Sequence, residues 1–179
     1  MKINKLQGFY LLIIFFNLLF KLLFLNTLRK ILCKLAGYKI GKNTSIQSVR
    51  FFSFGKLEIG NNTIVNSGCY LDNRRGIKIG NNVVIAHDTK IYTLGHDIND
   101  SEFKTQGKPV NIEDYVIIFS NVLIMPGVTI GKGAVVLPGS VVSKNIEPML
   151  VVGGNPISVI KKREKLHTDK KVINYWFSI

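Results

Sequence analysis

The chain has 179 residues, a formal net charge of +13, 46% hydrophobic residues and a positive mean hydropathy. This length fits one domain with appendages, and the hydrophobic content excludes an intrinsically disordered chain. Residues 1–56 carry ten basic and no acidic side chains, residues 57–160 carry eight and nine, and residues 161–179 carry six and two. A nucleic-acid-binding protein would carry its basic surface on the folded body, so the near-neutral centre argues against that class.

Residues 1–36 are predicted to form a hydrophobic, basic helical segment. Between Phe9 and Leu25 every residue is apolar except Asn17 and Lys21, which share one helical face. No small-residue cleavage site follows this run, which argues against a secretory signal. The run is at the short limit for a membrane-spanning helix, and basic residues on both sides give no clear orientation.

An interfacial helix suits this mixture best, because lysines can extend to the headgroups while the apolar body stays buried. A basic flank of Arg29, Lys30 and Lys34 would face anionic lipid. The alternative is that the helix packs on its own domain or on another subunit. The segment therefore predicts contact of residues 1–36 with a membrane surface.

The centre of the chain is a six-residue repeat. Aliphatic residues recur without a break at Ile112, Ile118, Ile124, Ile130, Val136 and Val142, and the spacing returns in Ile59, Val65, Leu71 and in Ile79, Ile85, Ile91. Small or β-branched residues stand four positions later, and Gly-Asn or Asn-Asn pairs follow many of the aliphatic residues. This period fits neither an α-helix nor a hairpin array. It predicts short strands joined by corners, three to a coil, with the aliphatic residues stacked inside a solenoid.

Two cysteines, Cys33 and Cys69, are too few for a disulfide framework and favour a reducing compartment. Cys69 falls in a small-residue position of the repeat, which predicts a buried, inert thiol rather than a nucleophile.

The repeat resembles the hexapeptide-repeat acyltransferases over about residues 37–163. The resemblance implies an all-β fold, a left-handed parallel β-helix, preceded by the hydrophobic helical segment and followed by a short tail or helix. It divides the chain into residues 1–36, a β-helix domain at 37–160 and a basic tail at 161–179, of which Lys161–Lys171 could be helical. In the tail, Tyr175, Trp176 and Phe177 are predicted to cover the open end of the last coil.

The repeat is interrupted between Ile91 and Ile112, where the polar stretch from Gly95 to Pro109 cannot maintain the core pattern. We expect residues 95–109 to leave the solenoid as a loop that carries the active site. The segment YTLGHDIND is similar to the catalytic segment of sugar and polysaccharide O-acetyltransferases, and this resemblance makes His96 the general base. An imidazole suits that task because it is largely neutral at pH 7 and can accept the hydroxyl proton during acetyl transfer.

Other polar residues are weaker candidates. By resemblance, Asp72 and Asn73 would orient His96 or bind the acceptor, although Asn73 could equally be a corner residue. Asp97 could bind substrate hydroxyls or only interact with solvent. His87 is expected to point outward with a smaller chance of a role in the site, and His167 lies in the basic tail. Three histidines, one beyond the repeat, do not make the three-ligand zinc site of the hydrases that share this fold, so no metal is expected.

The stretch from Ile112 to Ile160 resembles the family's last coils, where relatives bind coenzyme A in a groove between two subunits. That resemblance implies acetyl-CoA as co-substrate, a homotrimer, and donor contacts at Gly139, Ser140, Asn155, Pro156, Lys161, Lys162 and Arg163. Phe119 departs from the pattern, because the family often has glycine there, two residues after a tryptophan that is Ile117 here. Leu137 and Pro138 also replace smaller residues.

The sequence thus predicts an O-acetyltransferase that moves acetyl from acetyl-CoA to a sugar hydroxyl of a cell-surface polysaccharide or its lipid-linked precursor. Its expected location is cytoplasmic, peripheral on the inner face of the cell membrane, with no nucleic-acid partner. The alternatives are an acetyltransferase for a small free sugar, nucleotide sugar or xenobiotic, and, less favoured, a non-catalytic β-helix scaffold.

Overall fold

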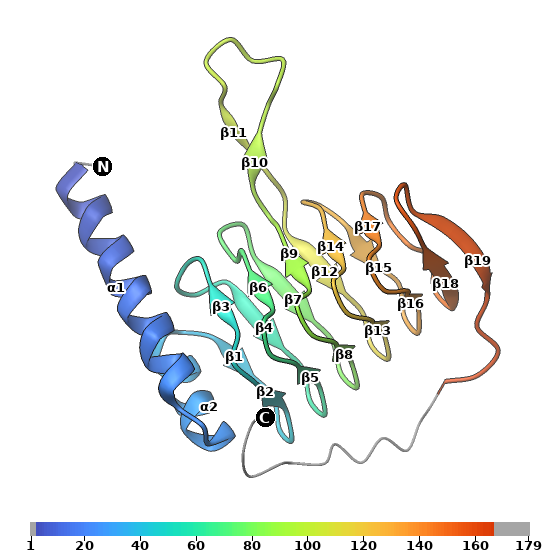
Figure 1. Ribbon diagram of the computed structural model, residues 1–179, viewed down its shortest axis with the longest axis horizontal. Helices are drawn as coiled ribbons and strands as arrows, with labels where there is room; N and C mark the ends of the chain where they lie inside the picture. The colour runs from blue at the N-terminus through green and yellow to red at the C-terminus, as the bar shows by residue number, and fades with distance from the viewer. Residues whose placement is uncertain (1–2, 167–179) are drawn as a thin grey trace.

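The protein is described by a computed structural model that covers residues 3–166. Its body is a triangular solenoid with three flat faces, and each face is a sheet of very short strands (Figure 1). Two helices lie at the N-terminal end, and one long hairpin stands away from the body (Figure 1). The hairpin leaves the solenoid between its two ends.

The elements follow the predicted repeat. The helices are α1 (Ile3–Leu22) and α2 (Asn26–Leu35). The first sheet contains β1 (Lys39–Ile40), β4 (Leu57–Ile59), β7 (Ile77–Ile79), β12 (Val110–Ile112) and β15 (Thr129–Ile130). The second contains β2 (Ser45–Ile46), β5 (Ile64–Val65), β8 (Val84–Ile85), β13 (Ile117–Ile118), β16 (Val135–Val136), β18 (Leu150–Gly153) and β19 (Ser158–Lys162). The third contains β3 (Arg50–Phe51), β6 (Tyr70–Leu71), β9 (Lys90–Ile91), β14 (Leu123–Ile124) and β17 (Val141–Val142).

The stacked core is the one that the six-residue period predicts. On the second face, parallel pairing places Ile46, Val65, Ile85, Ile118, Val136 and Val152 one above the other. All of these side chains are buried, as are the small residues at the corners, such as Thr63 and Ala134. Each coil therefore covers the apolar ladder of the next, and only the two ends of the solenoid would expose it.

The corners depend on residues that tolerate a left-handed backbone. Asn43, Asn62, Asn82 and Asn121 have φ between 52° and 59°, and Asn62 and Asn82 are the second members of the Asn-Asn pairs noted in the sequence. Gly60 has a different task, because a Cβ there would lie 2.6 Å from the backbone carbon of Gly80. Coils can stack this closely only where no side chain intervenes.

Helix α1 covers the open N-terminal end of the solenoid. Ile13, Phe16 and Phe20 are buried, and Phe20 packs edge-on against Phe51 of β3 at 5.1 Å between ring centroids. The Asn17 side chain both donates to and accepts from the Phe51 backbone, at 2.8 Å each. The residue that interrupts the apolar run thus pairs with an otherwise unpaired strand edge. The alternative prediction, that this helix packs on its own domain, is confirmed for one of its faces.

Helix α2 bonds in the same way to β2, the first strand of the second sheet. Asn26 accepts from the Ile46 backbone and donates to the Thr44 carbonyl, at 3.0 and 3.2 Å. Arg29 is buried, and its Nε donates to the Phe20 carbonyl at 3.3 Å. Of the predicted basic flank, therefore, only Lys30 and Lys34 are accessible to solvent, Lys30 in part. Within residues 3–166, no helix combines the length and the hydropathy that crossing a membrane requires.

The C-terminal end closes with a hairpin instead of the suggested helix. Strand β19 pairs antiparallel with β18 and includes Lys161 and Lys162, so it runs through the expected domain boundary at residue 160. The expectation of a helix from Lys161 is wrong for these two residues, because their backbone bonds complete the sheet edge. His167 and the aromatic residues 175–177 lie outside the described residues.

Candidate active site

The predicted loop is a two-stranded hairpin, β10 (Gly95–His96) paired antiparallel with β11 (Thr105–Gln106). Its turn is held by its own polar groups: Asp97 Oδ1 accepts from the Asn99 backbone at 2.9 Å, and Asp100 Oδ1 from the Glu102 backbone at 2.8 Å. Phe103 follows with a φ of 50°. This hairpin stands away from the solenoid at the point where the six-residue period is broken (Figure 1).

His96 is exposed, but its ring has a defined orientation. Nδ1 lies 2.7 Å from the Phe103 carbonyl oxygen, and the imidazole stacks on the Phe103 ring at 4.3 Å and 9° between planes. A carbonyl can only accept, so Nδ1 carries the proton in this hydrogen bond. In the neutral imidazole, Nε2 then keeps its lone pair, and none of the described residues hydrogen-bonds to it. One ring nitrogen is thus anchored and the other is left without a hydrogen-bond partner within residues 3–166, on a side chain that is exposed, which is the arrangement that general-base catalysis would require.

Phe103 is a candidate site residue that the sequence analysis missed. It contributes both its ring and its carbonyl to His96, yet its side chain is more than half exposed. An exposed aromatic residue within an otherwise polar loop was the available signal. The pairing of β10 with β11 brings the rings of His96 and Phe103 together, although the two residues are seven positions apart. The register of that pairing cannot be inferred from residue types alone.

Asp72 lies in the wall of the solenoid, fully buried. Its two carboxylate oxygens accept from Nε and Nη2 of Arg74 at 2.8 and 2.9 Å. The Thr93 backbone N–H and hydroxyl also bond to Asp72, at its carboxylate and its main-chain carbonyl. The Asp72 carboxylate thus bonds to Arg74 and to Thr93, in the segment that leads from β9 into the hairpin, and no hydrogen bond joins it to His96.

Asn73 has the corner position that the sequence left open as its alternative role. It is fully buried, accepts from the Ser53 backbone at 3.0 Å and donates to the carbonyls of Ser53 and Gly55 at 2.9 and 2.7 Å. These bonds join the corner at Asn73 to the segment between β3 and β4. His87 is exposed at a corner, and the described residues contain no cluster of side chains able to hold a metal ion.

The expected donor residues separate into exposed and internal groups. Gly139 is exposed at a corner with a φ of 68°, and Asn155 and Pro156 are exposed in the turn between β18 and β19. Ser140 is buried, and its hydroxyl donates to the Leu137 carbonyl and accepts from the Gly154 N–H. Ser140 therefore shapes this corner from inside.

The basic residues at the C-terminal end also divide. Lys161 and Lys162 are exposed on β19. Arg163 turns inward: its Nη1 donates to the Gly133 and Tyr115 carbonyls at 2.8 and 3.1 Å, and burial lowers its pKa. The guanidinium joins the last strand to two corners of the solenoid. Phe119 is exposed at the end of β13, beside the corner that holds Gly139.

A row of aromatic rings on the third face was not predicted as part of a site. Tyr70 and Tyr92 stand on neighbouring coils with ring centroids 5.6 Å apart, and Tyr92 is four residues before His96. The guanidinium of Arg50 lies 4.6 Å from the Tyr70 ring centroid, and that of Arg74 lies 4.0 Å from the Phe52 centroid. The row leads along the solenoid toward the foot of the hairpin.

Comparison with known proteins identifies the family. Residues 109–144 match the family described as bacterial transferase hexapeptide (six repeats). WcaF of Escherichia coli, provisionally named a colanic acid biosynthesis acetyltransferase, is 35% identical over 136 residues, which is 75% of each chain. The chain belongs to the hexapeptide-repeat acetyltransferases. Its solenoid is the left-handed parallel β-helix of that family, and the resemblance stated from the sequence is confirmed.

Other relatives agree. Galactoside O-acetyltransferase of Escherichia coli is 34% identical over 128 residues, 69% of this chain but 63% of its own, so the chain spans less than two thirds of that relative. The structure of a galactoside acetyltransferase with coenzyme A has a TM-score of 0.78 at 28% identity, covering 93% of this chain and 88% of the other. A hexapeptide-repeat acetyltransferase of Vibrio cholerae in complex with acetyl coenzyme A has a TM-score of 0.81 at 26% identity, covering 90% of both chains.

Proposed function

We propose that this chain is an acetyl-CoA-dependent O-acetyltransferase whose acceptor is a sugar hydroxyl of a cell-surface polysaccharide or of its lipid-linked precursor. The observation that carries the proposal is the anchored ring of His96, which leaves Nε2 facing solvent on the projecting hairpin. Relatives named for acetyl transfer to galactosides and for colanic acid biosynthesis support a sugar acceptor.

The chemistry follows from the tautomer. His96 Nε2 accepts the proton of the acceptor hydroxyl while that oxygen forms a bond to the acetyl carbon of the thioester. The Phe103 carbonyl stabilises the imidazolium that results, because Nδ1 already donates to it at 2.7 Å. When the carbon–sulfur bond breaks, His96 returns the proton to the leaving sulfur. The products are the acetyl ester and free coenzyme A, and no covalent bond to the protein is needed.

For the donor, we propose that the pantetheine runs along the exposed corner at Gly139 and that its phosphates meet Lys161 and Lys162 near the Asn155–Pro156 turn. Both lysines are exposed, and no described carboxylate pairs with them, which suits phosphate binding. Arg163 and Ser140 hold the backbone of this region from inside. The exposed Phe119 ring would pack against the pantetheine arm or restrict the acyl group that enters.

For the acceptor, we propose that the sugar lies on the aromatic row below the hairpin. Tyr70 and Tyr92 present partly exposed rings there, and binding sites for small organic ligands commonly combine aromatic walls with few polar groups. Asp97 is close to His96 in the turn and can accept from a sugar hydroxyl. Asp72 and Asn73 would act through Arg74 and the coil below. We further propose a homotrimer located in the cytoplasm and peripheral to the inner face of the membrane.

The test is coenzyme A release from acetyl-CoA with a panel of acceptors, from free sugars and nucleotide sugars to oligosaccharides. We expect acceptor-dependent release by the wild type and a loss of at least about hundredfold in kcat for His96→Ala. His87→Ala is the matched control, because His87 is also exposed but lies on a corner, and it should retain full activity. Equal turnover by both variants would overturn the role of His96. Preference for a free sugar would favour the small-molecule alternative.

A further inference from the structure

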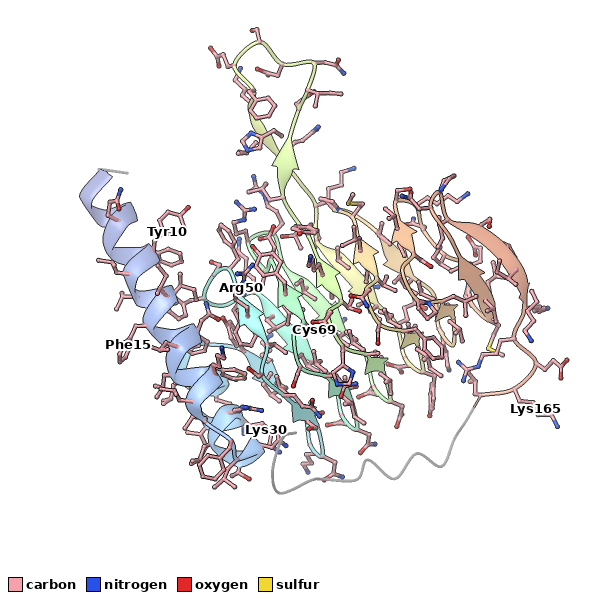
Figure 2. The ribbon with its side chains drawn as sticks, in the orientation of Figure 1. Tyr10, Phe15, Lys30, Arg50, Cys69 and Lys165 are labelled. Atoms are coloured by element: carbon pink, nitrogen blue, oxygen red, sulfur yellow. The ribbon has the colours of Figure 1, made fainter. Side chains whose placement is uncertain are left out.

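Helix α1 is apolar on both of its faces, and the solenoid covers only one. Ile13, Phe16 and Phe20 are buried against the first coil. On the opposite side, Leu11, Phe15, Leu18 and Leu22 recur at helical spacing and are 55–68% exposed. Figure 2 shows Phe15 on the side of α1 that points away from the solenoid. A helix that is apolar all round is normally buried all round, so a second covering surface is missing.

Helix α2 also exposes large apolar side chains, and we call the exposed apolar side chains of residues 10–35 together the outer helical face. Of the seventeen exposed large hydrophobic side chains among the described residues, eleven belong to residues 10–35. Soluble monomers rarely expose large apolar patches, and such patches mark sites that meet a partner or a membrane. The α2 end of the outer helical face comprises Phe24, Leu28, Ile31 and Leu35.

The charge around this face selects its partner. The chain has no acidic residue before Glu58, and that carboxylate is paired with Lys39 at 2.6 Å. Lys21 and Lys34 are exposed beside the apolar stripe. A second copy of the same end would bring two strongly basic surfaces together, which electrostatic repulsion opposes. An anionic lipid surface offers both an apolar interior and complementary charge.

A groove of about 250 Å³ lies between α1 and the first two coils. Lys21 borders it from the helix and Arg50 from β3, and no acidic residue lines it. Leu18 belongs both to this groove and to the outer helical face. Two cations from opposite walls, next to an exposed apolar stripe, match a phospholipid, whose phosphate adjoins its acyl chains.

We propose that the outer helical face docks on an anionic phospholipid surface, with a headgroup phosphate in the groove between Lys21 and Arg50. Helix α1 lies along the interface and does not cross it, because its other face is packed on the solenoid and Asn17 is bonded to β3. This docking extends the proposed function, which takes a lipid-linked glycan as one acceptor, by holding the catalytic hairpin beside the membrane.

The experiment is co-flotation of the full chain with vesicles. We expect binding to vesicles of phosphatidylethanolamine and phosphatidylglycerol, much weaker binding to vesicles of phosphatidylcholine alone, and release at high salt. Failure to float with the anionic vesicles, or equal binding to both kinds, overturns the proposal. A concentration-dependent dimer that is lost on substitution of the outer helical face, without vesicle binding, identifies a second copy as the occupant instead.

The apolar contribution is tested by the double substitution Phe15→Ser and Leu22→Ser. Both side chains are more than 60% exposed, so the fold should persist while vesicle affinity falls at least about tenfold. The matched control is Val159→Ser with Ile160→Ser, which removes two comparably exposed apolar side chains from β19 at the opposite end of the solenoid. The control should bind as the wild type does, and equal losses in both variants contradict the proposal.

The groove is tested by Lys21→Ala with Arg50→Ala, which should reduce affinity for anionic vesicles by about fivefold per residue. Lys161→Ala with Lys162→Ala is the charge-matched control at the other end and should leave vesicle binding unchanged. His96→Ala separates the two proposals, because it should lose acetyl transfer and still bind vesicles. An active enzyme that does not bind vesicles would contradict only the proposed docking surface. A protein that binds vesicles but has no acetyltransferase activity would contradict only the proposed enzymatic function.

Discussion

The solenoid and the hairpin that leaves it use their residues in opposite ways. In the solenoid, polar side chains such as Asp72 and Asn73 are buried and form hydrogen bonds within the body, including bonds to neighbouring coils. In the hairpin, the polar side chains are mostly exposed, and His96 has one nitrogen anchored and one facing solvent. Buried hydrogen bonds are thus concentrated in the solenoid, and the residue proposed as the base lies in the hairpin, as expected where function is built on loops above a stable scaffold. Substitutions should therefore separate stability from activity.

The largest expected change in stability comes from the solenoid core. Ile118→Ala removes a fully buried side chain that stacks between Ile85 and Val136. We expect it to lower the free energy of unfolding by about 2–5 kcal/mol, because the rigid coils cannot collapse into the cavity. Urea unfolding followed by circular dichroism measures the change. A loss below about 1 kcal/mol would mean that the ladder is not the main source of stability.

The next largest change in stability should distinguish Asp72 from Asp97, both of which the sequence analysis proposed as substrate-binding residues. Asp72→Ala leaves the Arg74 guanidinium and a buried backbone N–H without their acceptor, and should cost about 2 kcal/mol of stability, since Arg74 is partly screened by solvent. Asp97→Ala, in the hairpin, should change stability by less than about 0.5 kcal/mol. The same unfolding experiment compares them. Equal losses of unfolding free energy in the two variants would contradict the difference between the solenoid and the hairpin.

A smaller effect is expected from the Phe103 ring, which stacks on His96. Phe103→Ala keeps the carbonyl that anchors His96 and removes the stacking, which is worth roughly 1 kcal/mol. We expect kcat to fall about fivefold, with the free energy of unfolding unchanged and with Phe103→Tyr restoring activity. Steady-state coenzyme A release provides the measurement. Wild-type kcat in the alanine variant would show that stacking does not position the imidazole.

The smallest effect is expected at Cys69. The thiol is buried, Sγ donates to the Ala86 carbonyl at 3.2 Å, and burial raises its pKa to about 12. A raised thiol pKa favours the protonated form, so native protein at neutral pH should not react with iodoacetamide at this residue. Cys69→Ser should retain full kcat, since a hydroxyl can make the same bond. Rapid labelling of the native protein would contradict this account.

Short-range patterns predicted much of this molecule. The period of six located the ladder that contains Ile118, and its interruption located the hairpin that contains His96. Contacts between distant residues were beyond such patterns. Asn17 reaches Phe51, thirty-four positions away, and Arg163 reaches Tyr115, forty-eight positions away. The sequence placed Asn17 only on a helical face with Lys21 and assigned Arg163 to the donor, because a repeat shows which side chains point inward but not which strand edges and carbonyls need partners.

The most direct test of the central claim is chemical rescue of His96→Gly. The account predicts that this variant loses at least about hundredfold in kcat, keeps the wild-type free energy of unfolding, and regains activity when free imidazole is added, because the base faces solvent on an exposed hairpin. Wild-type turnover by His96→Gly without imidazole would contradict the account.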